Sequence, residues 1–251
     1  MRLRSLVAAA AALLVAGPAA AQRAKPAKPA CGIQFLPLAE GNYWVFEPIN
    51  QPPAGPPPAK VKIEVVKVEP QGKKAATITL KETYRDVEFE MKATCDAAQL
   101  VLPPESFFFA AEPGGVSGMQ IEGFEHKGAS FPAKGLKPGD QWFEEIRFDV
   151  VRVPAEGSNA THDPAKVELE RLTTVTRGQQ LVDTAFGPFK AQVVEFEIRG
   201  RGIIGEKSQE IPVRDKGILW FSKRIGLSRA RDVSGREWQL VDTNLVAKNA
   251  P

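Results

Sequence analysis

The clearest pattern along the chain is a strict alternation of apolar and polar residues. In the segment VEFEMKATC, at 87–95, apolar or small side chains fall on the odd positions and charged or polar ones on the even positions. Successive side chains of a β-strand point to opposite faces, so this period of two predicts a half-buried strand whose last residue, Cys95, points inward. Segments 61–65 and 76–80 follow the same rule.

The alternation returns in the second half of the chain and predicts further strands. Gly, Pro, Asp or Ser bound them, and no window has the spacing of a long amphipathic helix. Strands with one polar face are typical of antiparallel sheets with a solvated side. We therefore expect a mainly β protein, an antiparallel curved sheet arranged as a meander or partial barrel with few or no helices. The further strands are expected at 143–153, 167–176, 193–198, 217–221, 227–233 and 237–241.

Three proline-rich segments interrupt the alternation. They are NQPPAGPPPA at 50–59, the region 103–138 and PAEGSNATHDPA at 154–165. Proline removes a hydrogen-bond donor from a sheet, so these segments are expected to be loops. A fourth segment, GRGIIG at 200–205, joins two expected strands without a following helix, which favours a hairpin turn or bulge over a phosphate loop.

One motif occurs twice. Gly41, Asn42 and Trp44 belong to the pattern L-x-x-G-[N/D]-x-W, which returns at Gly139, Asp140 and Trp142. Gly followed by Asn or Asp favours a turn, which here delivers a Trp into a strand. Two similar halves, joined near 103–138, would produce this repeat, and so would a recurring device for entering a strand.

The N-terminus has the pattern of a secretory signal peptide. Arg2 and Arg4 precede a short apolar run and the small residues Ala19–Ala21, which predicts cleavage after residue 21. The run is shorter than the roughly 20 residues that cross a bilayer, and no later stretch reaches that length. We expect a signal peptide at 1–21, a Pro/Ala/Lys tether at 22–30 and a single β domain at 31–247, exported to the periplasm or secreted.

Charge and cysteine content narrow the picture further. Without the signal peptide, 31 basic residues (33 minus 2) face 30 acidic ones, and the signs alternate along the chain, so a nucleic-acid partner is not expected. The two cysteines, Cys31 and Cys95, are expected to pair as a disulfide in an oxidising compartment. Two inert buried thiols are the alternative, whereas a lipid-modified Cys31 is disfavoured because residues 22–30 separate it from the apolar run.

The segment FLPLAEGNYWVFE, at 35–47, carries a P-L-x-x-G-N-x-W turn, and GILWFSKRIGLSRA, at 217–230, reads as paired strands joined at a Gly-Leu turn. With FGPFKAQVVEFE at 186–197, these segments resemble the TapB-type group of bacterial exported and lipoprotein-like β domains of unknown function. The resemblance covers about half of the mature chain. It implies a curved β domain of the cell envelope with no assigned catalytic residues.

Candidate catalytic and metal-binding chemistry is sparse. The two histidines, His126 and His162, lie in loop-like stretches without ligand spacing, so no metal or other cofactor is expected. Acidic residues are numerous, but their alternation with apolar residues favours a solvated strand face over a catalytic pair. Those acids are Glu144, Glu145, Glu168, Glu170, Glu195 and Glu197.

The segment LVLPPESFFFAAEPGG places Phe107, Phe108 and Phe109 side by side. Three adjacent rings cannot share one face of a strand, so they either close the core or present a hydrophobic surface to a ligand or partner. The sequence favours a noncatalytic envelope binding or accessory protein over an enzyme. An apolar small molecule, such as a lipid on a concave sheet, is the first candidate ligand, and an envelope protein is the alternative partner. The sequence does not determine the oligomeric state.

Overall fold

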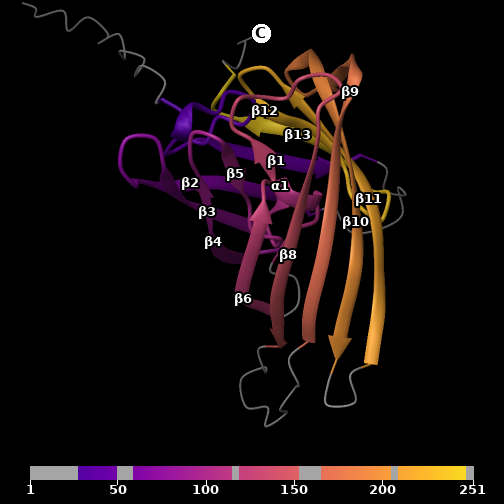
Figure 1. Ribbon diagram of the computed structural model, residues 1–251. Helices are drawn as coiled ribbons and strands as arrows, with labels where there is room; N and C mark the ends of the chain where they lie inside the picture. The colour runs from indigo at the N-terminus through magenta and orange to yellow at the C-terminus, as the bar shows by residue number, and fades with distance from the viewer. Residues whose placement is uncertain (1–27, 50–58, 115–118, 153–164, 205–208, 247–251) are drawn as a thin grey trace, which may run out of the picture.

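Thirteen antiparallel strands form one continuous sheet in the computed structural model, and they curl around one main core (Figure 1). The fold class predicted from the alternation is confirmed. The structure describes residues 28–49, 59–114, 119–152, 165–204 and 209–246. The expected signal peptide, most of the tether, His162 and most of the loops at 50–59 and 154–165 lie outside these ranges.

The secondary structure consists almost entirely of strands, with one short 3-10 turn, Ala30–Gly32, and one short helix, α1. The elements are β1 (Tyr43–Pro48), β2 (Val61–Pro70), β3 (Ala76–Tyr84), β4 (Val87–Cys95), β5 (Gln99–Val101), α1 (Phe107–Ala110), β6 (Met119–Gly128), β7 (Phe131–Pro132), β8 (Gln141–Arg152), β9 (Ala165–Thr184), β10 (Gly187–Ile204), β11 (Gln209–Ser222), β12 (Gly226–Arg231) and β13 (Glu237–Thr243).

The sheet consists of two meanders joined by one strand. Strands β1 to β5 neighbour one another in chain order, as do β8 to β12, and β13 lies between β12 and β1. In Figure 1, β8 to β11 run lengthwise and extend beyond β1 to β4, which cross them at a steep angle. The strands at the two ends of the sheet are β6 and β7, and only Ala129 and Ser130 connect them. These two residues keep the ends of the open sheet close together.

The region 103–138, expected to be a loop, contains regular structure. Helix α1 and strands β6 and β7 all lie within it, and His126 belongs to β6 rather than to a loop. Proline had argued against a sheet here, but the prolines at 103, 104 and 113 fall between the elements. The expectation of a long loop was therefore wrong for the part that forms β6.

Strands β9 and β10 are longer than the sequence pattern predicts. They span 20 and 18 residues and form a hairpin whose register shifts between Gln192 and Val194. The first five residues of GRGIIG, 200–204, continue β10 instead of forming the expected turn, and Gly205 lies outside the described residues. A Cβ at Gly200 would lie 2.0 Å from the backbone oxygen of Glu168 on β9, so this glycine allows a close approach of two strands.

The two copies of the turn motif have the same hydrogen bonds. The N–H groups of Gly41 and Gly139, whose φ angles are 81° and 89°, donate to the carbonyl oxygens of Val65 and Val175. The N–H groups of Val65 and Val175 in turn donate to the carbonyls of Asn42 and Asp140. A positive φ favours glycine, which explains its place in both copies. Each turn precedes the first strand of a meander, β1 and β8, and this placement does not distinguish the two interpretations of the repeat.

The indole N–H groups of the two motif tryptophans donate hydrogen bonds to different acceptors. The indole N–H of Trp44 donates to the carbonyl of Ile225 at 2.6 Å, and that of Trp142 donates to the carbonyl of Ser130 at 3.0 Å. Trp44 is fully buried, whereas Trp142 is partly exposed at the edge of the core. Each indole therefore satisfies its only donor while its ring packs on the sheet.

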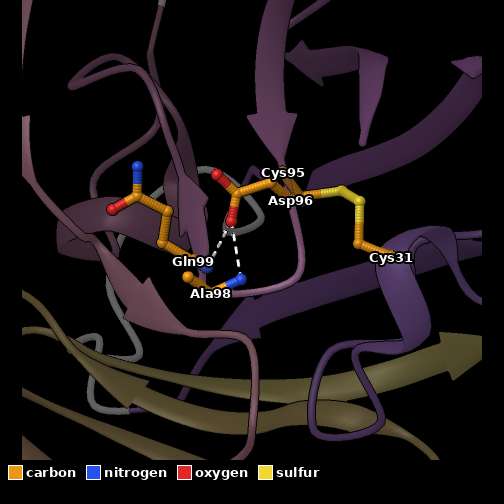
Figure 2. Close-up of a disulfide and its surroundings, with 5 residues drawn as sticks. All are labelled: Cys31, Cys95, Asp96, Ala98 and Gln99. Atoms are coloured by element: carbon orange, nitrogen blue, oxygen red, sulfur yellow. Dashed lines mark hydrogen bonds between the residues drawn. A yellow bond between two sulfur atoms is a disulfide. The ribbon is translucent and has the colours of Figure 1, made fainter. Parts of the chain in front are cut away.

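Cys31 and Cys95 form the predicted disulfide (Figure 2). The bond joins the N-terminal 3-10 turn to the end of β4 and closes a loop with a sequence separation of 64. A crosslink of that span is worth about 4 kcal/mol in the chain-entropy model. Next to it, the Asp96 carboxylate accepts hydrogen bonds from the N–H groups of Ala98 and Gln99, at 2.6 and 2.9 Å, and so shapes the turn into β5 (Figure 2).

Candidate functional site

Phe107, Phe108 and Phe109 form α1 and lie inside the curved sheet. Their exposed fractions are 0%, 0% and 2%. The Phe107 ring lies 4.8 Å from Phe46 and 5.5 Å from Trp238, between centroids. The three rings therefore fill the core, which is the first of the two alternatives that the sequence left open. A ligand or partner surface at these residues has no exposed ring to support it.

A buried ion pair lies against the third ring of α1. The Arg171 guanidinium, on β9, donates to the Glu144 carboxylate, on β8, at 2.9 Å, and both side chains have no exposed surface. The guanidinium carbon lies 4.5 Å from the Phe109 ring centroid, and the rings of Phe131 and Phe196 also face it, at 5.4 and 4.9 Å. A cation surrounded by aromatic faces gains electrostatic attraction in a site that excludes water.

The Glu144 carboxylate has two further partners. His126 Nε2 lies 2.9 Å from it and the Ser130 hydroxyl donates to it at 3.1 Å. Burial by itself would raise the pKa of Glu144, but the hydrogen bond from His126 and the charge of Arg171 outweigh burial and lower this pKa. The carboxylate is therefore held ionised where β6, β8 and β9 meet.

This cluster contains the serine, histidine and carboxylate of a catalytic triad, but it lacks the geometry of one. A serine nucleophile is activated by a histidine that accepts its proton. Ser130 and His126 instead both bond to Glu144, and no bond between the two is present in the part of the chain that the structure describes. The arrangement ties the end strand β6 to the rest of the sheet.

The expectation that Glu144 lies on a solvated face was wrong. The other five acids of that set are exposed or half-exposed. The signal that sequence reasoning missed is the spacing along β8. Glu144 lies two residues from both Trp142 and Ile146 and so shares their inward face. A charged residue in step with an apolar stripe indicates a buried charge with a partner.

A second buried carboxylate fixes the segment that contains α1. Glu82, on β3, has no exposed surface and accepts hydrogen bonds from the N–H groups of Phe107, at 3.1 Å, and Gly114, at 2.7 Å. Burial raises the pKa of Glu82 to about 8, against the opposing effect of these two bonds. Burial also raises the pKa values of Glu105 and Glu112 in the same segment.

We expect the free energy of unfolding to fall as the pH rises from 4.5 to about 8. A carboxyl whose folded pKa lies above its unfolded value binds its proton more tightly when folded, so ionisation in that window opposes folding. One pKa unit corresponds to about 1.4 kcal/mol, so Glu82 alone should account for several kcal/mol. Urea titrations at pH 5 and pH 8 measure this difference.

The variant Glu82→Gln should lose most of that pH dependence, because the amide does not ionise. Glu88→Gln serves as the control, since Glu88 is an exposed acid in the next strand. Equal pH dependence in the two variants would show that Glu82 is not the group responsible.

Unlike the filled core, a groove next to the disulfide-linked turn is open to solvent. Its volume is about 500 Å³, and it lies between the N-terminal segment 32–35, the loop 133–136 and strands β9 to β11. Phe35 and Phe221 form its apolar floor, with ring centroids 5.6 Å apart and at right angles. The groove therefore pairs aromatic surface with access for a ligand.

The rim of this groove carries three lysines from three separate elements. Lys134 comes from the loop between β7 and β8, Lys190 from β10, and Lys223 from the turn between β11 and β12. All three are exposed, and none has an acidic partner among the described residues. No acid of the described ranges lines the groove, so these residues give its rim an uncompensated positive charge.

Neutral donors complete the lining. Gln34 and Gln179 are exposed at the groove, while Gln192 is 8% exposed and donates from its side-chain amide to the Thr176 carbonyl at 2.8 Å. The side-chain oxygen of Gln192 has no partner in the described ranges. Sequence reasoning missed this groove because its residues come from segments that the sheet alone brings together.

The described residues contain no cluster of three metal-ligating side chains. No helix within the described ranges is long and apolar enough to cross a membrane.

Comparisons with known proteins identify the fold. No family model and no curated protein matches the chain. A predicted exported protein from Bacteroides fragilis with a YmcC-like fold matches with a TM-score of 0.50 and 13% identity over 84% of this chain and 99% of its own. A predicted lipoprotein from Parabacteroides distasonis matches with a TM-score of 0.52 and 15% identity over the same shares.

The hypothetical lipoprotein YmcC from Escherichia coli also matches, with a TM-score of 0.35 and 12% identity over 87% of this chain and 88% of its own. The chain thus shares the fold of the Bacteroides and Parabacteroides proteins. Because the sequence identities are this low, the likeness is limited to the architecture. The TapB-type resemblance is not confirmed by these comparisons and stays a prediction.

Proposed function

We propose that this protein is a noncatalytic binding protein of the bacterial cell envelope that holds its ligand in the groove beside the disulfide. The observation that carries the proposal is the contrast between two places in the structure. The interior under α1 is filled by aromatic rings, whereas the groove is open, partly apolar and lined by three lysines that have no acidic partner among the described residues.

Three observations support the envelope as the compartment. The first 21 residues have the pattern of a signal peptide. A disulfide between the two cysteines of the chain is typical of an oxidising environment outside the cytoplasm. The two neighbours that share the fold are described as a predicted exported protein and a predicted lipoprotein.

The filled core also bears on where the ligand binds. A lipid under Phe107, Phe108 and Phe109 would have to displace rings that already pack against Phe46, Trp44 and Trp238. The groove needs no such displacement. We therefore assign the ligand to the groove. The proposed noncatalytic role of the protein rests on the lining, to which the described residues contribute lysines, amides and aromatic rings but no acid or histidine.

Native mass spectrometry of the protein isolated from the bacterial periplasm tests the proposal. We expect extra mass that denaturation removes, and a lower occupancy in the variant Lys134→Gln/Lys190→Gln/Lys223→Gln. A bare polypeptide mass, or a bound molecule that the triple variant keeps in full, would refute the groove as the ligand site.

A partner-binding role without a ligand is the second candidate. It is favoured by Phe143 and Leu172, which face each other across β8 and β9 and keep 46% and 43% of their surface exposed. Neighbouring exposed apolar side chains on an outer sheet face are suited to a protein contact. A bare mass, together with a reproducible crosslinked envelope protein that Phe143→Ser/Leu172→Ser loses, would support this role.

A further inference from the structure

The lysine-rimmed groove shows which chemical class of ligand it suits, an inference that rests on the proposed function. Its lining combines three lysines with three glutamines, and none of the described lining residues is an acid or an arginine. The positive charge favours an anion, and the amide groups add donors that carry no charge. An uncharged lipid or an apolar small molecule would leave the lysines without a counter-charge.

The choice of lysine over arginine narrows the anion further. The planar guanidinium of arginine grips a carboxylate or a phosphate through two parallel hydrogen bonds, whereas lysine binds phosphate as a point charge. Lysine presents a compact charge with three rotatable donors, which suits the oxygens around a tetrahedral phosphorus. The three lysines line the same groove from three different elements.

Contacts with the core and the disulfide hold the floor and one wall of the groove in place. Phe35 packs at 5.6 Å against both Phe131 and Phe221, so the apolar floor is held by rings of the core. The disulfide anchors the wall formed by residues 32–35, because Cys31 precedes Gly32 directly. Gln192 is held by its bond to Thr176 and keeps its oxygen free of partners in the described ranges. An apolar or sugar portion of the ligand can therefore lie on the floor while its anionic group meets the rim.

We infer that the groove binds a ligand bearing a phosphate group, either as a free phosphoester or as the headgroup of a phospholipid, through Lys134, Lys190 and Lys223. The three ammonium groups neutralise the anion and the aromatic floor carries the remainder of the molecule. Because the lysines are exposed, the interaction should weaken as the ionic strength rises.

Isothermal titration calorimetry of the mature, oxidised protein with inorganic pyrophosphate tests the inference. We expect binding by the wild type and a loss of affinity of about tenfold or more in Lys134→Gln/Lys190→Gln/Lys223→Gln. The matched control is Lys73→Gln/Lys74→Gln/Lys92→Gln, which removes the same charge from exposed lysines of β2 to β4 and their connections and should keep wild-type affinity. Thermal unfolding checks that both variants are folded. No binding by the wild type, or equal losses in both variants, overturns the inference.

Two further titrations separate the sources of the phosphate and the class of anion. Cosedimentation with phosphatidylglycerol vesicles, reversed by pyrophosphate and absent with phosphatidylcholine, identifies a lipid headgroup, whereas pyrophosphate binding without cosedimentation identifies a free phosphoester. Citrate, a tricarboxylate, should bind more weakly than pyrophosphate, because its charges are spread over a larger molecule. Equal affinity for citrate overturns the phosphate inference and leaves the proposed binding function standing, since that function is tested by the mass of the native ligand.

Discussion

Replacing Arg171 by methionine is expected to destabilise the protein by about 3–5 kcal/mol, because it leaves the Glu144 carboxylate buried without its cationic partner. Methionine keeps much of the apolar stem against Phe109 and Phe196, so the loss reports chiefly on the charge. Urea denaturation monitored by tryptophan fluorescence measures the change in the free energy of unfolding.

Two comparisons show whether the loss comes from the buried charge. Arg199→Met removes an exposed arginine paired with Glu197 and should cost about 1 kcal/mol or less. The double variant Arg171→Met/Glu144→Leu removes both charges and should recover part of the loss, although Ser130 and His126 then lose their acceptor. A double variant less stable than Arg171→Met would contradict this account.

Replacing Phe107 by alanine is expected to cost about 3–5 kcal/mol, because the ring is fully buried and its removal leaves a cavity where α1 packs on β1 and β13. Its two neighbours, Phe46 and Trp238, are themselves fully buried and cannot move far to fill that space. The same urea titration measures the effect.

The matched control for this substitution is Phe143→Ala, which removes a ring that is 46% exposed on the outer face of β8 and should cost clearly less. If Phe107 served a ligand surface instead of the core, Phe107→Ala would leave the stability close to that of the wild type. That outcome would reopen the interior as a ligand site.

The pattern along the chain predicted most of the architecture because its signals are local. Period-two alternation located the strands, and two cysteines behind an N-terminus typical of export predicted the bond between Cys31 and Cys95. The turn motif predicted strand entry at Trp44 and Trp142, since a positive φ at glycine and a donor on the indole are properties of a few neighbouring residues.

Other features depended on pairing between distant strands. The alternation at 193–198 marked only the middle of β10, because the rest of this strand is stabilised by backbone bonds to β9 and β11 and needs no apolar stripe. Glu82 and Glu144 were hidden among many acids, although each is in step with the apolar face of its strand. Burial of a charge is decided by the partner that reaches it, and that partner lies elsewhere in the chain.

By itself, therefore, the sequence determined a mainly β fold, a disulfide and an N-terminus typical of export, since these follow from periodicity, composition and short motifs. Only the tertiary structure decided that the three phenylalanines fill the core and that Arg171 lies in an aromatic cage. It also decided that Lys134, Lys190 and Lys223 share one groove. The reason is physical: a curved antiparallel sheet brings together residues far apart along the chain, and no local pattern records which of them will meet.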